Sequence, residues 1–439
     1  MAPIRQFIEF ILKRKWLGIL LILGFVIGVG ISTVYRGAIS PKQRTDLTVF
    51  LIAGEMVQEG RASHIYGIEN KRHWHYVYPP ILAVLLAPIS KWPLGVTVTL
   101  AYLLSLTCLA GTILLSQRLP ERSGPATTGR QDHASVSASL GCRPENWQIA
   151  LSMFFCLPMI LNTLTRGQFG IITLFFMAAL FYGYWTRHKV LTGLLLAFAI
   201  SLKISPLAYL VFFFLMKREW KILLSATLGF GVFLFLFPSA VIGFRQNWEL
   251  LQIWQGLMSV SQSDGAYKHY LWGELFTPFT EDNQSIYAAV TRFVWPSLGS
   301  FIGHSNAPVR FITSGLGILL LALPFLPAQK KPQTQAEDPL RSLAEFSLFP
   351  MIMLFTSPVT QIHHYTVIYF LFLVTLMMMD RAPRGSWTRK CLGFSLWFCA
   401  LFLTLGMVIP IVGYWGLPLW GSILLWGVVL LNLKKEPAI

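Results

Sequence analysis

The run WLGILLILGFVIGVGISTV, residues 16–34, decides the fold class of this chain. It carries no charged side chain, and a helix of this length rises about 28 Å, which spans the hydrocarbon core of a bilayer. Residues 1–15 are basic, and the apolar run is longer than the apolar part of a cleaved signal peptide. We therefore expect a permanent membrane anchor.

The composition of the whole chain points the same way. Of 439 residues, 54% are hydrophobic and 12% are charged, whereas soluble proteins carry about 25% charged residues. The charges are mostly positive, with 35 Lys and Arg against 19 Asp and Glu, a formal net charge of +16. A basic chain can bind nucleic acid, but so apolar a body argues against that partner.

Eleven further apolar segments follow the anchor, which predicts an all-α polytopic membrane protein with about 12 transmembrane helices. The expected crossings are 16–34, 94–116, 147–164, 169–185, 190–202, 204–216, 222–242, 309–327, 345–357, 363–379, 391–411 and 415–431. Several are shorter than a full span, notably the two that flank Lys203 and the one that ends at Ser357. Short helices that meet at a polar residue predict a water-filled cavity entering the membrane from one side.

The basic residues predict the orientation. With the N-terminus in the cytoplasm, an even number of crossings returns the C-terminus there, and 22 of the 35 Lys and Arg then lie on cytoplasmic segments. We expect one integral-membrane domain, 1–439, in the plasma (inner) membrane. Two long loops, 35–93 and 243–308, would lie outside and carry interfacial helices, while the polar linkers 117–146 and 328–344 would lie in the cytoplasm.

The first candidate for chemistry is Asp46, near the start of TDLTVFLIAGEMVQEG (45–60) in the first long loop. The apolar residues Leu47, Phe50 and Leu51 recur at helical spacing, so we expect Asp46 to cap an interfacial helix. A capping aspartate with no further function is the ordinary alternative.

Three more candidate polar residues lie toward the outer face. Tyr78 ends HWHYVY before two prolines that stop any helix, and the apolar piece 81–89 that follows is too short to cross. Arg166 and Gln168 lie in NTLTRGQFG between two expected crossings. On its own, Arg166 fits a snorkelling interface anchor better than a ligand-binding residue. Together with the other polar residues of this face, we expect Arg166 and Gln168 to bind the donor, and Tyr78 is a candidate substrate-binding residue.

Lys203 lies in AISLKISPL, between two short apolar segments. A lysine near membrane depth is unfavourable unless it has a function, and its ammonium group suits a phosphate. The alternative is that it snorkels to the outer interface.

The stretch SPVTQIHHY contains His363 and His364 at the start of a crossing. Adjacent residues on a helix point about 100° apart, so we expect the two rings not to share one direction. This argues against a two-histidine metal site, and hydrogen bonding to phosphate or sugar is the better interpretation. The five cysteines show no metal or disulfide spacing.

The second long loop contains EDNQSIYAAVTRF, residues 281–293. Asn283, Gln284 and Ser285 match a glycosylation acceptor, a pattern frequent by chance. Arg292 would share a helix face with Ser285, so Asn283, Gln284 and Arg292 are candidate substrate-binding residues.

A carboxylate, a lysine, histidines and amides on one side of a membrane cavity suit transfer of a sugar from a lipid phosphate. The departing phosphate needs cations and the acceptor hydroxyl needs a base. A lipid or solute transporter with a phosphate-binding Lys203 is the main alternative, although it predicts repeat symmetry, which the sequence lacks. A structural scaffold would leave Lys203 and the histidine pair without purpose.

These strings, in this order, resemble the polyprenol-phosphate-mannose-dependent mannosyltransferases, glycosyltransferase family 87, which have the C-type membrane glycosyltransferase fold. The resemblance extends from about Asp46 to His364. It rests on DLTVF…AG…Y with YPP, RGQFGIITL, G…A…SLKISPL, NQS and SPVTQIHHY.

The resemblance implies a hexosyltransferase that moves a sugar, expected to be mannose, from a polyprenyl-monophosphate donor to an acceptor hydroxyl, with inversion. The acceptor stays open between a glycolipid, a lipoglycan and a protein. It implies that Asp46 is the catalytic base, that Lys203 binds the donor phosphate, that His363 and His364 lie near the phosphate or sugar, and that Gln168, Asn283 and Gln284 line the site. Related enzymes often carry paired acids in the first outer loop, whereas here Thr45 precedes Asp46. This difference implies a metal-free monophosphate donor and no cofactor.

Overall fold

The computed structural model describes residues 15–71, 73–119, 143–260, 277–295, 307–326 and 338–434. Within these ranges every regular element is a helix, and strand-like pairing is limited to two isolated bridges, Glu69–His75 and Asn283–Gln361. The polytopic all-α fold class is therefore confirmed. Most of the two predicted linkers, and several basic residues used to orient the chain, lie outside the described residues.

Eight helical segments of the described chain are long and apolar enough to cross a membrane. They are Gly18–Ile39 (most of α2 Lys15–Val34 with η1 Tyr35–Ile39), Leu94–Gln117 (α5), Asn146–Arg166 (α6), Trp220–Ile242 (α10 Trp220–Phe230, η5 Gly231–Leu236 and α11 Phe237–Ile242), Ala307–Phe325 (α16 Ala307–Ala322 and η7 Leu323–Phe325), Ile362–Arg381 (η8 Ile362–Ile368 and α18 Tyr369–Arg381), Trp387–Val408 (α19) and Leu417–Lys434 (α21).

The other four expected crossings correspond to shorter or more polar helices. These are α7 Gly170–Trp185, α8 Lys189–Leu202, α9 Leu210–Met216 with η4 Leu207–Tyr209, and α17 Pro339–Thr356. The first three fall in the class of short apolar helices, so the total of 12 crossings stays a prediction.

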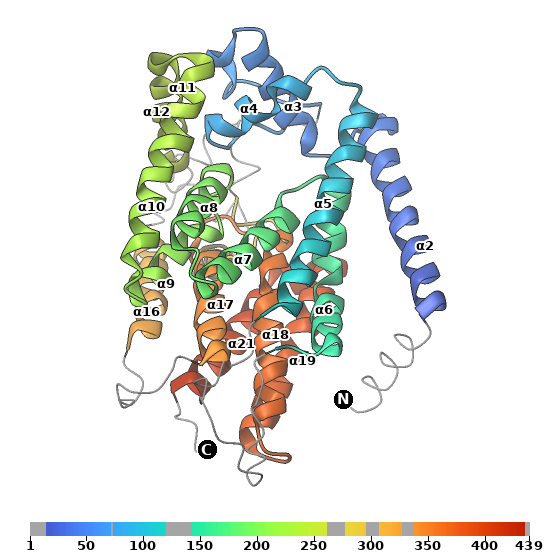
Figure 1. The fold of residues 1–439 in the computed structure, drawn as a ribbon, viewed down its shortest axis with the longest axis vertical. Coiled ribbons are helices and arrows are strands. Elements are labelled where there is room, and N and C mark those ends of the chain that lie inside the picture. The colour runs from blue at the N-terminus through green and yellow to red at the C-terminus, as the bar shows by residue number, and fades with distance from the viewer. Residues whose placement is uncertain are drawn as a thin grey trace, which may run out of the picture.

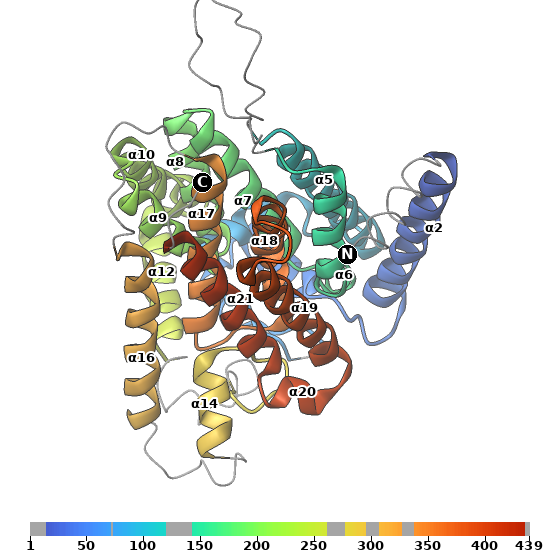
Figure 2. The ribbon, with the colours of Figure 1, turned by 90° about the horizontal axis from the view of Figure 1, so that it is seen from below.

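The buried centre of the molecule is α18, which packs against α6, α17 and α19 (Figure 2). In Ile362–Arg381, 89% of the most apolar 18-residue window is buried, against 11% in Gly18–Ile39. The anchor helix α2 is therefore peripheral, and it contacts the rest of the protein mainly through α5 and α6.

Short helices lie across one end of this bundle, at the top of Figure 1. There α3 Leu47–Gln58 packs on α4 Pro80–Leu86 and η3 Ala87–Ile89. Gly54 permits this approach, because a Cβ there would lie 3.0 Å from the backbone nitrogen of Ala87. The helix predicted to follow Asp46 and the short piece at 81–89 are both confirmed.

Four further helices are described. They are η2 Ala62–His64 in the first long loop, α12 Phe244–Val260 and α14 Ile286–Val294 in the second long loop, and α20 Pro410–Tyr414 near the C-terminus.

Candidate active site

A cavity of about 260 Å³, lined by charged and polar side chains as well as apolar ones, is formed by four segments that are far apart in the sequence. Asp46, Val49, Phe50, Trp74, His75, Val77 and Tyr78 come from the first long loop, Arg166 and Gln168 from the turn between α6 and α7, Thr280 and Asp282 from the second long loop, and Val359, Gln361, His363 and His364 from the start of the α18 segment. Six predicted site residues are thus brought together: Asp46, Tyr78, Arg166, Gln168, His363 and His364.

Asp46 is held against the end of α6 by backbone contacts. Its N–H donates to the Arg166 carbonyl at 2.8 Å, and the Thr45 hydroxyl donates to the same oxygen at 3.0 Å. Asp46 precedes α3 but its side chain makes no capping hydrogen bond, so the predicted cap is wrong. The reason is its helical backbone (φ −77°, ψ −15°), because a capping side chain needs an extended one. The buried carboxylate lines the cavity instead.

The glycines of RGQFG allow this arrangement. Gly167 has φ +66°, and a Cβ there would lie 2.7 Å from the Thr45 hydroxyl. At Gly170 a Cβ would lie 2.8 Å from the Thr163 hydroxyl and 3.1 Å from the His363 carbonyl. The turn between α6 and α7 therefore touches both the loop that carries Asp46 and the segment that carries the histidines.

Arg166 is half-buried and its guanidinium lies 5.8 Å from the centre of the Trp74 ring. Among the described residues no carboxylate forms an ion pair with it. Gln168 is buried, and its Oε1 accepts no hydrogen bond from any described group. A cation and an amide therefore face the cavity with capacity to bind a ligand.

Lys203 directly follows α8 and interacts electrostatically with Asp46 and both histidines of this cavity, although it is absent from the set of lining residues. Its side chain is buried, and within the described chain its Nζ has no hydrogen-bond partner, which does not fit snorkelling to an interface. Burial lowers the pKa of Lys203 to about 8, while the nearby Asp46 carboxylate opposes this change. A buried ammonium without a partner is unfavourable, and a bound anion would relieve it.

His363 and His364 lie at the start of η8, and both rings line the cavity. Their ring centres are 4.4 Å apart with an interplanar angle of 74°, an edge-to-face contact. The two rings are therefore in contact and line one cavity, although adjacent residues of a helix point about 100° apart. Neither Nδ1 atom has a hydrogen-bond partner among the described residues.

Tyr78 lies on the apolar side of the cavity, with its ring 5.0 Å from Phe50 in an edge-to-face contact. Burial, reinforced by the Asp46 carboxylate, raises the pKa of Tyr78 above its ordinary value. The hydroxyl therefore stays protonated and can donate a hydrogen bond.

Asn283, Gln284 and Arg292 do not line the cavity, so the prediction that they contact substrate finds no support in the geometry. The Asn283 amide donates to the Pro358 carbonyl at 3.1 Å and its oxygen accepts from the Thr360 N–H at 3.1 Å. The Gln284 amide donates to the Gly413 carbonyl at 2.7 Å.

Arg292 completes this set of contacts from α14. Its guanidinium donates to the carbonyls of Pro278 (2.7 Å), Thr280 (2.8 Å) and Asn283 (3.0 Å). We call Asn283, Gln284 and Arg292 the loop clamp, because they fix the wall with Thr280 and Asp282 to the wall with Gln361 and the histidines.

Several further residues line the cavity that the sequence patterns did not single out, namely Trp74, His75, Thr280, Asp282 and Gln361. Four of these belong to strings already singled out, HWHYVYPP, EDNQS and SPVTQIHHY, so neighbouring polar residues of those strings were the available signal. Within the described ranges, no group of three or more His, Cys, Asp or Glu could hold a metal ion. Independence from metal stays a prediction.

The sequence profile of glycosyltransferase family 87 matches residues 76–358, more than half of the chain. The chain belongs to glycosyltransferase family 87. This family 87 protein is also similar to a polyprenol-phosphate-mannose-dependent alpha-(1-2)-phosphatidylinositol mannoside mannosyltransferase of Mycolicibacterium smegmatis. The two are 24% identical over 370 residues, which cover 82% of this chain and 73% of the relative. Membership of family 87 makes this a membrane glycosyltransferase and favours an enzyme over a transporter.

Proposed function

We propose that the protein transfers mannose from a polyprenyl-phosphate donor to a hydroxyl of a glycolipid on the outer face of the plasma (inner) membrane. The observation that carries this proposal is the pairing, in one cavity, of the Asp46 carboxylate with Arg166 and two histidines, while the buried Lys203 lies close by. A phosphosugar needs both kinds of group at once, a base for the acceptor and cations for the leaving phosphate.

The reaction is a single displacement at the anomeric carbon. Asp46 accepts the proton of the acceptor hydroxyl as its oxygen bonds to the anomeric carbon, and the bond from that carbon to the phosphate oxygen breaks. The polyprenyl phosphate leaves with the bonding electrons, and Lys203, Arg166 and a histidine stabilise its charge. Attack opposite the leaving group inverts the anomeric configuration.

The relative supports the choice of donor and suggests the first acceptor to try. Its name specifies a polyprenol-phosphate-mannose donor and a phosphatidylinositol mannoside acceptor. We propose the same donor here, together with a glycolipid or lipoglycan acceptor. The two carboxylates of the cavity, Asp46 and Asp282, come from different loops, and the reaction as written uses no metal ion.

Asp46→Asn tests the proposal. With radiolabelled polyprenyl-phosphate mannose and membrane lipid, we expect purified Asp46→Asn to transfer mannose about 10²–10⁴-fold more slowly than wild type, the range for loss of a general base. Glu249→Gln is the control, because Glu249 forms an exposed ion pair with Arg245 on α12 and should leave the rate unchanged.

Two results would contradict the proposal. Near-normal turnover by Asp46→Asn, at an unchanged midpoint of thermal unfolding, would exclude Asp46 as the base. Absence of transfer by wild-type protein from any polyprenyl monophosphosugar would exclude the donor class and favour transport.

A further inference from the structure

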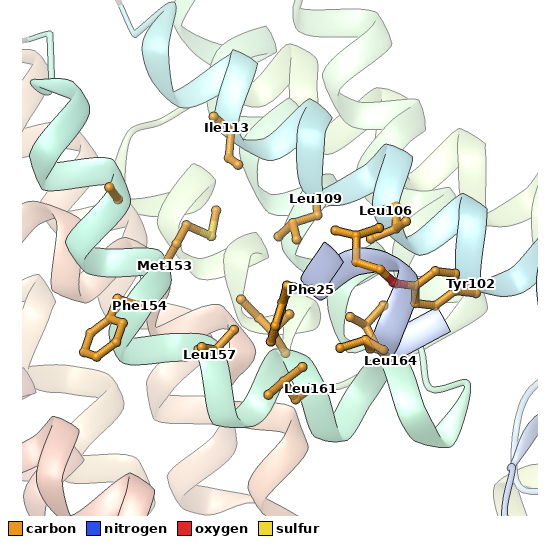
Figure 3. Close-up of a pocket in the computed structure, with 14 residues that line it drawn as sticks. Phe25, Tyr102, Leu106, Leu109, Ile113, Met153, Phe154, Leu157, Leu161 and Leu164 are labelled. Atoms are coloured by element: carbon orange, nitrogen blue, oxygen red, sulfur yellow. The ribbon is translucent and has the colours of Figure 1, made fainter. Parts of the chain in front are cut away.

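Two cavities in the described chain offer different chemistry to a ligand. One, of about 210 Å³, lies between α2, α5 and α6, and none of its lining residues is charged (Figure 3). The other contains the candidate active site and is lined by the charged residues Asp46, Arg166 and Asp282. The proposed reaction uses Asp46 and Arg166 but gives Asp282 no function.

Asp282 lies nearer the solvent than Asp46 does. Asp46 is 7% exposed, whereas Asp282 and Thr280, which line the same cavity, are both exposed. Gln361 beside them is half-buried. A polar headgroup that enters the cavity from water therefore meets Asp282 before it reaches Asp46.

The wall around Asp282 is held in place by backbone contacts. Asn283 forms an isolated antiparallel bridge with Gln361, and the Gln284 N–H donates to the Thr360 carbonyl at 2.6 Å. The loop clamp fixes the same piece of backbone. Asp282 directly precedes Asn283, so its carboxylate and the Gln361 amide are presented to the cavity by one rigid unit. Polar groups fixed in this way orient a ligand at a low cost in entropy.

Three side chains of this wall have hydrogen-bonding capacity left. The Thr280 hydroxyl, the Asp282 carboxylate and the Gln361 amide form no hydrogen bond or ion pair with any described residue. A carboxylate accepts hydrogen bonds, while a hydroxyl and an amide both donate and accept, which suits the hydroxyls of a polyol. The negative charge of Asp282 repels a phosphate, whereas Arg166 and Lys203 attract one.

We propose that Asp282, with Thr280 and Gln361, binds hydroxyls of the acceptor's sugar headgroup that do not react, an inference that rests on the proposed function. The donor phosphate is directed to the cations of the same cavity, and the uncharged polyol of the acceptor to the wall with Asp282. An acceptor held by its other hydroxyls presents the reacting one to Asp46. Asp282 is then a residue that determines which acceptor is used.

The first test separates the two substrates by kinetics. With polyprenyl-phosphate mannose as donor and a phosphatidylinositol mannoside or an alkyl mannoside as acceptor, we expect Asp282→Asn to raise the KM for the acceptor about tenfold. This is the lower end of the range for loss of a hydrogen bond to a charged group. The KM for the donor and kcat should stay nearly unchanged, because the contact is the same in the bound acceptor and in the transition state.

Glu281→Gln is the matched control. Glu281 is the neighbouring exposed carboxylate and does not line the cavity, so its variant loses the same charge and should keep all three constants. A rise in the donor KM of Asp282→Asn, with the acceptor KM unchanged, would show that Asp282 binds the donor's mannose. Constants equal to wild type would show that it binds neither substrate. Either result overturns the inference.

The second test asks whether the contact is made with acceptor hydroxyls. Acceptors that each lack one non-reacting hydroxyl are compared in wild type and in Asp282→Asn. For the hydroxyl that Asp282 binds, the deoxy acceptor and the variant should each raise the acceptor KM about tenfold, and combining them should add little. Independent, additive effects for every deoxy acceptor would overturn the inference. A lowered midpoint of thermal unfolding with equal losses for all acceptors would assign Asp282 to loop structure and overturn it as well.

The inference and the proposed function can fail separately. If wild-type protein transfers mannose and Asp282→Asn does so with the same constants, the inference is wrong and the proposed function stands. If wild-type protein transfers no sugar from a polyprenyl monophosphate to either acceptor, the proposed function fails and the inference fails with it.

Discussion

Two opposing effects act on the pKa of Lys203, its burial and the nearby negative charge of Asp46. The ammonium group is buried without a hydrogen-bond partner among the described residues, and burial lowers its pKa to about 8 even though the Asp46 carboxylate acts in the opposite direction. At neutral pH most molecules therefore still carry the charge. A donor phosphate would supply the missing anion and raise the pKa again.

This position predicts a pH dependence for donor binding. As the pH rises through about 8, Lys203 of the free enzyme loses its proton and the attraction for phosphate falls. Because kcat/KM reports the free enzyme and kcat the bound complex, kcat/KM for the donor should fall above pH 8 while kcat falls only at higher pH. Initial rates between pH 6 and 10 would measure both.

Lys203→Arg is the control for that profile. A guanidinium stays charged over the whole range, so the variant should lose the alkaline fall in kcat/KM, whatever its absolute rate. An identical fall in Lys203→Arg would mean that another group titrates.

Among the elements, α14 acts as a support for the cavity. Its Arg292 is 1% exposed and donates to three backbone carbonyls of the second long loop. Removing this donor leaves the two buried acceptors, the carbonyls of Pro278 and Asn283, desolvated and without the guanidinium as a partner. The loop clamp therefore stabilises the wall that carries Thr280 and Asp282.

We expect Arg292→Met to reduce the free energy of unfolding by about 1–3 kcal/mol or more and to lower the midpoint of thermal unfolding in detergent. Arg245→Met on α12 is the matched control, because Arg245 is exposed and pairs only with Glu249 in the described chain. An unchanged midpoint in Arg292→Met would show that the clamp contributes nothing to stability.

The sequence predicted the elements of the site better than the direction of its side chains. The stripe of Leu47, Phe50 and Leu51 located α3, but the helical backbone of Asp46, which removes the cap, depends on the contact with Arg166 across 120 residues. Helical spacing placed Arg292 on one face of α14. Which partners that face meets depends on how residues 277–285 fold back, and no local pattern encodes this.

For the whole molecule, exposure to lipid and burial divide the helices into two groups. The Ile362–Arg381 segment is almost enclosed, whereas Gly18–Ile39 and Ala307–Phe325 are mostly exposed in the protein alone. The apolar runs of both groups look alike in the sequence, since a core and a bilayer favour the same residues. For this reason the apolar runs located the helices. They could not show which helices are buried inside the protein and which face lipid, or establish that 12 of them cross the membrane.

The predicted orientation can be tested by cysteine labelling. In a background without native cysteines, Ser63→Cys in the first long loop should react in intact cells with a membrane-impermeant maleimide. Arg384→Cys, between α18 and α19, should react only after the membrane is opened. Both positions are exposed, so access to the reagent depends on the side of the membrane. The reverse pattern would place the candidate active site in the cytoplasm.

The loop clamp also has a consequence during synthesis. Asn283 hydrogen-bonds to Pro358 and Thr360, and the histidines follow these residues, so the cavity that contains Asp46 is complete only after residue 364 has left the ribosome. At translation rates of about 5–20 residues per second, that is roughly 16–64 s after Asp46 itself emerges. A chain that stalls earlier is inserted in the membrane with its carboxylate in place and no opposite wall. We expect such an incomplete chain not to transfer sugar, because the wall of the cavity that carries the two histidines is still missing.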